Sequence, residues 1–568
     1  MQGYNWLTDV EQSAIVPPPI SISTAAGSDD VIAFAGVTKR YAGLPAIGAL
    51  VICGAAGLFS VVLGPDNYWD LRFYHLYVPW AYLHHRYLYD VAPAEYQSFF
   101  NPIADFLFYG MVSSTLNEMP RTIAFIMGAV HGFNAVLIAA IACHVLRPRE
   151  QWARMVLRVG AVLIGISGAG FVPLVGTTSN DLVNSIFVLG ALLGILRIAG
   201  SPGERPAWRG FAWAGLCAGV GLGLKYTAAV YMPGFVVVAL MVAIRRRTAA
   251  GFAVFGACAA LSFLALAGHH LFTLWRDFGN PTFPILNNIF KSPYFELESG
   301  MQNEFQARNF WQLIAYPFYW VKTNSYVVAE LPLRDWRGAM AYLAIIAALL
   351  ARVAGLARKE PRRNAGGETC GLGLVFIFAI MSYFVWAYVF GNYRYAVALE
   401  MLTGVIIMGT VIWLVRGRGR RMAAAIVLLT IAVATTVYPD WGRGRYGERY
   451  VDVRVPPLPA HSIVLISTRQ PVAFFIPYAE PTAQFIGFEN DFLDPSQKNR
   501  LVSKVRSVMR TQGRPKFIVS VGTFDSGKLD SVLAQFGLSL GPSACRPIRS
   551  NLDNPVLSIC AAVPRQPK

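Results

Sequence analysis

The sequence predicts an α-helical, polytopic membrane protein with a small α/β domain at its C-terminal end. Hydrophobic residues make up 55% and charged residues 14% of its 568 residues, whereas soluble domains carry about 25% charged residues. Apolar runs recur at about the length, roughly 20 residues, that a membrane-spanning helix needs. Much of the excess positive charge lies in short segments between these runs, such as "RPREQWAR" and "RGRGRR". The net charge of +17 therefore indicates topology, not nucleic-acid binding.

Eleven spans are expected, with the N-terminus in the cytoplasm. They cover roughly residues 44–63, 121–146, 156–175, 182–199, 208–224, 226–244, 250–274, 336–355, 371–390, 395–415 and 421–438. This threading places the basic loops on the cytoplasmic side, as the positive-inside rule requires. Residues 1–43 are polar and are expected to be a disordered cytoplasmic N-terminus. The first apolar run begins too far into the chain for a signal peptide.

The same threading leaves two large external loops, 64–120 and 275–335. Segments 73–87 and 101–116 of the first loop are interpreted as helices on the membrane surface. Residues 439–568 alternate short apolar strands with polar helical stretches, which predicts a periplasmic α/β domain. In an oxidising compartment, Cys545 and Cys560 would form a disulfide.

Polar groups at a membrane boundary are costly and therefore informative. Asp70, Asp181, Lys225 and Arg394 interrupt or flank apolar runs on the predicted outer side. Lysine and arginine together suit a phosphate or diphosphate, and a nearby carboxylate suits a general base. Asp70 and Asp181 are the catalytic candidates. The candidates for substrate binding are Tyr74, His75, Asn101, Lys225, His269, Lys291, Arg394, Tyr395 and Glu400.

Ordinary structural roles remain open for these residues. Asp70 could pair with Arg72 or Arg86, and Arg394 with Glu400. Asp181 could cap the fourth span, and Lys225 could extend to the interface as an anchor. Asp66 competes with Asp70 as the base. Asp70 is preferred because Tyr74 and His75 follow it at helical spacing.

The order of these motifs resembles the GT-C superfamily of integral-membrane glycosyltransferases, which use polyprenyl-phosphate-linked sugars. "DLRFYHLYVPWAYLHHR" resembles the Asp-bearing start of the first external loop in lipid A aminoarabinose transferases and protein O-mannosyltransferases. "GLGLKYTA" and "NYRYAVALE" resemble the Gly-Lys turn and the late Arg-Tyr motif of such enzymes. "GNPTFPILNNIFKSPYF" resembles the second external loop of a little-characterised bacterial branch. Leu71 stands where O-mannosyltransferases carry a second acid, which makes a protein acceptor less favoured.

The resemblance implies a glycosyltransferase that moves a sugar from a polyprenyl-phosphate carrier to a lipid, glycan or protein acceptor at the periplasmic face of a bacterial inner membrane. Asp70 would be the base, and Lys225 and Arg394 would hold the leaving phosphate. Superfamily members differ in metal dependence, so a magnesium or manganese ion is compatible with the resemblance and not implied by it. The alternatives are a transporter or lipid flippase, which predicts internal repeats, and a polysaccharide polymerase or ligase. The sugar, the acceptor, the stereochemical outcome and the oligomeric state stay open.

Overall fold

The structure is a computed structural model that describes residues 43–148, 150–200, 207–322, 324–355, 365–523, 525–543, 545–552 and 556–565. Residues 1–50 and 51–568 form separate units. The expected disordered N-terminus lies outside the described residues apart from Gly43.

Long apolar helices are the largest elements of the structure. Within the described residues, seven helical segments are long and apolar enough to cross a membrane. They are Ala46–Leu63, Pro120–Val145, Asp181–Gly200, Tyr226–Arg246, Ala249–Phe278, Gly371–Val389 and Tyr393–Leu414. They belong to α2 (Gly43–Leu63), α5 (Pro120–Val145), α8 (Asp181–Gly200), η5 (Tyr226–Tyr231) with α10 (Met232–Arg246), α11 (Ala249–Phe278), α15 (Ala365–Val389), and η7 (Tyr393–Ala396) with α16 (Val397–Leu414).

Four further helices occupy other predicted spans: α6 (Gln151–Ile166), α9 (Ala207–Leu224), α14 (Arg337–Val353) and α17 (Arg418–Ala434). The polytopic helical fold is thus confirmed, and the number eleven stays a prediction. A short helix, α7 (Phe171–Leu174), follows α6 within the predicted third span.

Helix α9 is held against α11 by a row of glycines. A side chain at Gly215 or Gly219 would meet the backbone oxygen of Phe255 or Ala259 at 2.3 or 2.0 Å. Small residues four apart allow such close backbone approach between membrane helices. The packing fixes the end of α9, and Lys225 follows directly.

Residues 64–120, which are predicted to be the first external loop, are built of short helices. They are η1 (Leu71–His75), α3 (Tyr77–Leu83), η2 (Glu95–Phe99), η3 (Pro102–Ala104), α4 (Phe106–Val112) and η4 (Thr115–Glu118). The predicted surface segments 73–87 and 101–116 are therefore helical but broken into pieces. The second loop holds α12 (Asn287–Phe290), α13 (Phe310–Ala315) and η6 (Tyr316–Phe318).

The C-terminal part folds around a mixed seven-stranded sheet of order β1-β6-β7-β4-β2-β3, with β5 paired to β7. The strands are β1 (Val453–Arg454), β2 (Ile463–Ile466), β3 (Gln484–Gly487), β4 (Lys516–Val521), β5 (Leu538–Leu540), β6 (Arg546–Ser550) and β7 (Leu557–Pro564). Strand β2 pairs in parallel with β3 and β4. The helices are η8 (Ala473–Tyr478), α18 (Arg500–Arg510) and α19 (Ser526–Ala534). A disulfide joins Cys545 to Cys560, as expected.

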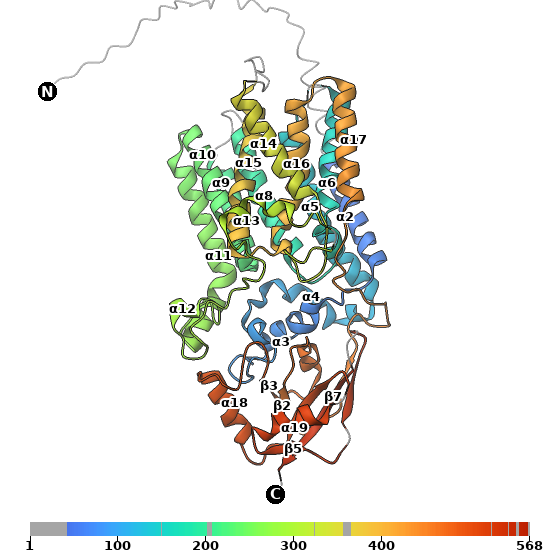
Figure 1. Cartoon of the computed structure of the whole chain (residues 1–568), viewed down its shortest axis with the longest axis vertical. Helices are drawn as coiled ribbons and strands as arrows, with labels where there is room; N and C mark the ends of the chain where they lie inside the picture. The colour runs from blue at the N-terminus through green and yellow to red at the C-terminus, as the bar shows by residue number, and fades with distance from the viewer. Residues whose placement is uncertain are drawn as a thin grey trace, which may run out of the picture. The chain divides into compact units, whose positions relative to one another are not determined.

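The first external loop docks on this sheet. Val91 forms a parallel bridge with Ile486 of β3, so the loop pairs with the edge strand of the sheet. Helix η8 packs against η1 and α3, and Figure 1 shows α3 and α4 between the helical bundle and the strands. Leu71 and Phe73 of η1 share one buried cluster with Phe474 and Phe475 of η8. The C-terminal domain thus lies on the same side of the membrane as the first external loop and supports η1.

Candidate functional site

Asp70 and Arg394 meet although 324 residues separate them. Arg394 donates through Nη1 to Asp70 Oδ2 at 2.9 Å. Asp70 immediately precedes η1, and Arg394 lies in η7 at the head of α16. The Asn392 side chain accepts from the Arg394 amide at 3.2 Å and so caps η7. The structure thus pairs Asp70 with Arg394, whereas Arg86 pairs with Asp90.

Aromatic rings surround the guanidinium of Arg394. Its carbon lies 5.2 Å from the ring centres of both Tyr68 and Trp441 and 5.9 Å from that of Tyr395. Arg394 is 7% exposed, and its buried Nε has no hydrogen-bond partner among the described residues. A desolvated guanidinium with an open donor is suited to bind an oxyanion.

Burial raises the pKa of the Asp70 carboxyl, but the charges of Arg394, His75 and Lys225 outweigh burial and hold that pKa below its usual value. Asp70 is therefore ionised at neutral pH. Its side chain retains 13% exposure, so the carboxylate lies at the edge of the cluster.

Lys225 and Asp181 form the second ion pair of the site. Lys225 Nζ donates to Asp181 Oδ1 at 2.7 Å and to the Ser179 carbonyl at 3.0 Å. Asp181 begins α8, and its buried Oδ2 has no partner among the described residues. Lys225 Nζ also lies 5.3 Å from the ring centre of Tyr395, the ring that faces Arg394 as well. The two ion pairs therefore form one cluster around Tyr395.

Tyr74 and His75 lie beside this cluster. Their ring centres are 4.1 Å apart, and both lie in η1, the turn that directly follows Asp70. His75 Nδ1 lies 2.6 Å from Asp105 Oδ1, which also accepts from Asn180 Nδ2 at 2.6 Å. The predicted residues Asp70, Tyr74, His75, Asp181, Lys225, Arg394 and Tyr395 are thus brought together.

The remaining predicted residues have other partners. Asn101 donates to the carbonyls of Gly223 and Leu266 at 3.0 and 3.3 Å, which ties the first loop to the turn before Lys225. His269 is exposed and contacts the Tyr82 hydroxyl at 2.9 Å.

Glu400 and Lys291 are not drawn into the cluster by any contact of the described residues. Glu400 accepts from the amides of Gly170 and Phe171 at 2.7 and 2.9 Å. The expected Arg394–Glu400 pair is not formed. Lys291 is exposed in the second loop.

Asp66 is occupied by the backbone. Its Oδ1 accepts from the Tyr68 amide at 2.9 Å, and its Oδ2 accepts from the Thr178 amide and hydroxyl at 2.8 and 2.7 Å. Because Asp66 is 1% exposed and fully hydrogen-bonded, the geometry favours Asp70 as the base.

Two acidic residues near the site were not among the sequence candidates. Glu330 lies 3.9 Å from Arg394 Nη2 and comes from the second loop, where nothing in its sequence context sets it apart. Asp105 had a signal, since it is a lone carboxylate in the apolar run "NPIADFLFYG".

The donor set does not fit a divalent cation. The described residues contain no group of three or more His, Cys, Asp or Glu side chains able to hold one. Asp70 and Asp181 are each paired with a cationic side chain. No step of the reaction is therefore assigned to a metal.

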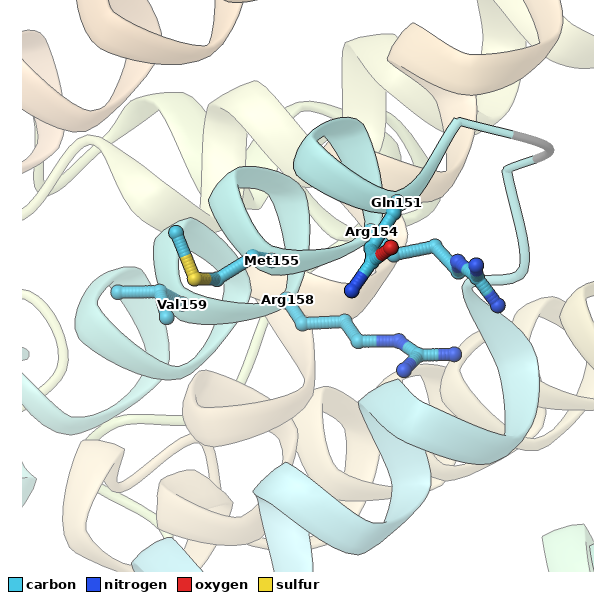
Figure 2. A pocket seen from close by; sticks show the side chains of 5 residues that line it. All are labelled: Gln151, Arg154, Met155, Arg158 and Val159. Carbon is cyan, nitrogen blue, oxygen red and sulfur yellow. The ribbon is translucent and has the colours of Figure 1, made fainter.

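A shallow pocket of ≈ 530 Å³ lies on α6, apart from the cluster. It is lined by Gln151, Arg154, Met155, Arg158 and Val159 (Figure 2). Arg158 donates to the carbonyls of Leu146 and Cys143 at 2.8 and 3.0 Å, where α5 ends. Its charge therefore caps a helix terminus.

A family model and several solved structures resemble the chain. The model of glycosyltransferase family 87 matches residues 99–382, half of the 568-residue chain. The chain belongs to glycosyltransferase family 87. It is therefore a multi-pass membrane glycosyltransferase, and the identification of a GT-C-type enzyme is confirmed.

Solved structures resemble this family 87 chain at low identity. ArnT from Cupriavidus metallidurans, bound to undecaprenyl phosphate, is 11% identical with a TM-score of 0.49, over 93% of this chain and 99% of that one. AglB, the oligosaccharyltransferase of Archaeoglobus fulgidus, in complex with an inhibitory peptide and a dolichol-phosphate, is 12% identical with a TM-score of 0.44, over 88% and 71%. No curated protein matches the chain.

Proposed function

We propose that this family 87 glycosyltransferase transfers a sugar from a polyprenyl-phosphate-linked donor to a lipid, glycan or protein acceptor at the periplasmic face of a bacterial inner membrane. The observation that carries the proposal is one cluster of two ion pairs, Arg394–Asp70 and Lys225–Asp181. Its members come from four separate places in the chain: the start of η7, the residue before η1, the end of α9 and the start of α8.

Arg394 and Lys225 would bind the donor phosphate. Both cations now neutralise carboxylates, and a phosphate entering between them would take over part of that role. The open Nε of Arg394 supplies a donor that no described residue uses. When the sugar–phosphate bond breaks, charge builds on the leaving phosphate, and fixed cations stabilise that charge.

Asp70 would deprotonate the acceptor. The hydroxyl loses its proton to Asp70, its oxygen forms a bond to the anomeric carbon, and the bond from that carbon to the phosphate oxygen breaks. The lipid phosphate leaves with the bonding electrons, held by Arg394 and Lys225. Asp181 would keep Lys225 oriented through their 2.7 Å contact.

Two observations support the periplasmic face. The first external loop and the C-terminal domain contact each other and so share one side. The predicted opposite side carries the basic loops, which favours a cytoplasmic location for them.

Transfer by the purified full-length protein tests the proposal. A panel of radiolabelled polyprenyl-phosphate sugars would be offered with total membrane lipid, glycan and peptide acceptors. Asp70→Asn should lower kcat by about 10²–10⁴-fold. Arg394→Lys keeps one charge but loses the guanidinium fork, and kcat/KM should fall by about tenfold or more.

The exposed pair Asp452–Arg454, 3.4 Å apart, supplies the matched controls. Asp452→Asn and Arg454→Lys make the same chemical changes away from the cluster and should leave transfer within twofold of wild type. Well-folded wild type that consumes none of the donors would overturn the proposal and favour the transporter alternative. Full activity in folded Asp70→Asn would remove Asp70 as the base.

A further inference from the structure

The turn that carries Asp70 has an unusual geometry. Residues Leu71–His75 form a single π-helical turn, a form with i→i+5 hydrogen bonds that often occurs at functional sites. Asp70 and His75 are five residues apart, so this turn brings them to the same side.

His75 is held in one orientation by Asp105. Its Nδ1 lies 2.6 Å from Asp105 Oδ1, and the two residues are 1% and 4% exposed. A carboxylate can only accept a hydrogen bond, so Nδ1 carries the hydrogen. In the neutral ring, Nε2 is then the acceptor.

The Nε2 of His75 is buried and has no hydrogen-bond partner among the described residues. A buried polar atom without a partner is costly and calls for an explanation. This atom is therefore an unused proton acceptor on the turn that directly follows Asp70.

The Asp70 carboxylate binds a proton only weakly. Burial opposes its ionisation, but Arg394 and the other nearby cations keep its pKa below the usual value. A proton taken from an acceptor hydroxyl would therefore leave Asp70 readily, and an imidazole is a stronger base.

We propose that His75 Nε2 receives the acceptor's proton from Asp70, with Asp105 as the positioning residue that fixes the tautomer and stabilises the imidazolium. This inference rests on the proposed function. The hydroxyl proton passes to Asp70 and then to His75, while the electron pair of the sugar–phosphate bond leaves with the lipid phosphate. The cycle closes when His75 returns the proton to water after product release.

The charged groups around this relay come from four elements. Asp70 lies on the same turn, Asp105 between η3 and α4, Arg394 on η7 and Lys225 before η5. Arg394 and Lys225 disfavour an imidazolium, whereas Asp70 and Asp105 favour it.

Steady-state kinetics across about pH 5 to 8 test the relay in the full-length protein. His75→Gln should lower kcat by about 10²-fold or more, with the donor KM within twofold, and should remove the acid limb of the kcat profile. Asp105→Asn should lower kcat less and shift that limb to lower pH, because the imidazolium loses its partner. The control is His84→Gln, an exposed histidine of the same loop stacked on Trp80, and it should match wild type.

Two results would overturn the relay. One is a folded His75→Gln protein with kcat within threefold of wild type and an unchanged pH profile. The other is a wild-type kcat that stays flat down to about pH 5, a measurement that needs no variant to fold. Either result leaves the proposed function standing if wild type transfers sugar, whereas inactivity of wild type with all donors would reject the function itself.

Discussion

Replacing Arg86 with alanine should release the C-terminal domain from the first external loop. Arg86 donates to Asp90 Oδ2 through Nε at 3.1 Å and to Asp90 Oδ1 through Nη2 at 2.8 Å. It also donates to the carbonyls of Pro481 and Ala483 at 2.9 and 2.5 Å. Asp90 Oδ1 in turn accepts from the Phe485 amide of β3 at 3.0 Å. The pair therefore joins the loop to the edge of the sheet.

The size of the effect follows from burial. The side chains of Arg86 and Asp90 are 8% and 1% exposed, and removing one partner of such a pair leaves an uncompensated buried charge. The cost is about 3–5 kcal/mol. At about 1.36 kcal/mol per tenfold change, hydrogen–deuterium exchange protection of the β3 amides should fall by roughly two to four powers of ten. Arg86→Lys, which keeps charge but loses the fork, should give a smaller loss.

Exchange measured by mass spectrometry on the detergent-solubilised or nanodisc-bound protein gives this number directly. Arg449 provides the control because its pair with Glu118 also links the C-terminal part to the first loop, at 3.1 Å, but is 54% and 63% exposed. Exposed pairs contribute about 0–1 kcal/mol, so Arg449→Ala should change protection less than about fivefold. Equal effects of the two alanine variants would refute the reasoning.

Three further predictions follow from other contacts. Lys225→Gln should lower kcat/KM for the donor about 10–100-fold, the equivalent of one charged hydrogen bond of about 1.5–3 kcal/mol, and an unchanged kcat/KM would exclude Lys225 from phosphate binding. Glu400→Gln weakens two charge-assisted bonds to backbone amides and should lower the midpoint of thermal unfolding in detergent; an unchanged midpoint would contradict this. Burial, together with the charge of Asp491, raises the pKa of Glu95 from 4.5 to about 8. Between these values the folded state holds a proton that the unfolded chain releases, so the free energy of unfolding should fall as the pH rises. Glu95→Gln should remove that slope, and a slope that persists would place its origin elsewhere.

The sequence predicted the helices well because membrane spans are encoded locally. The predicted span 121–146 corresponds to α5 at Pro120–Val145, and 182–199 to α8 at Asp181–Gly200. Hydropathy and the charge of short loops are properties of neighbouring residues, so no knowledge of tertiary contacts is needed.

Partners at the site could not be predicted in the same way. The sequence offered Arg72 or Arg86 as the partner of Asp70 and Glu400 as the partner of Arg394, yet Asp70 pairs with Arg394 across 324 residues. Which charges meet depends on how helix ends converge, and hydropathy carries no such information. The π-turn at Leu71–His75 was likewise read as ordinary helical spacing, because one inserted residue per turn leaves no compositional trace.

The edge bridge between Val91 and Ile486 has a consequence for how the enzyme is made. At about 5–20 residues per second, the 395 residues that separate Asp90 from Phe485 take roughly 20–80 s to synthesise. The segment that carries Asp70 is therefore made well before its supporting sheet, and Arg394 is added only within that interval. A newly made chain therefore holds both Asp70 and Arg394 before the strands that support η1 have been synthesised.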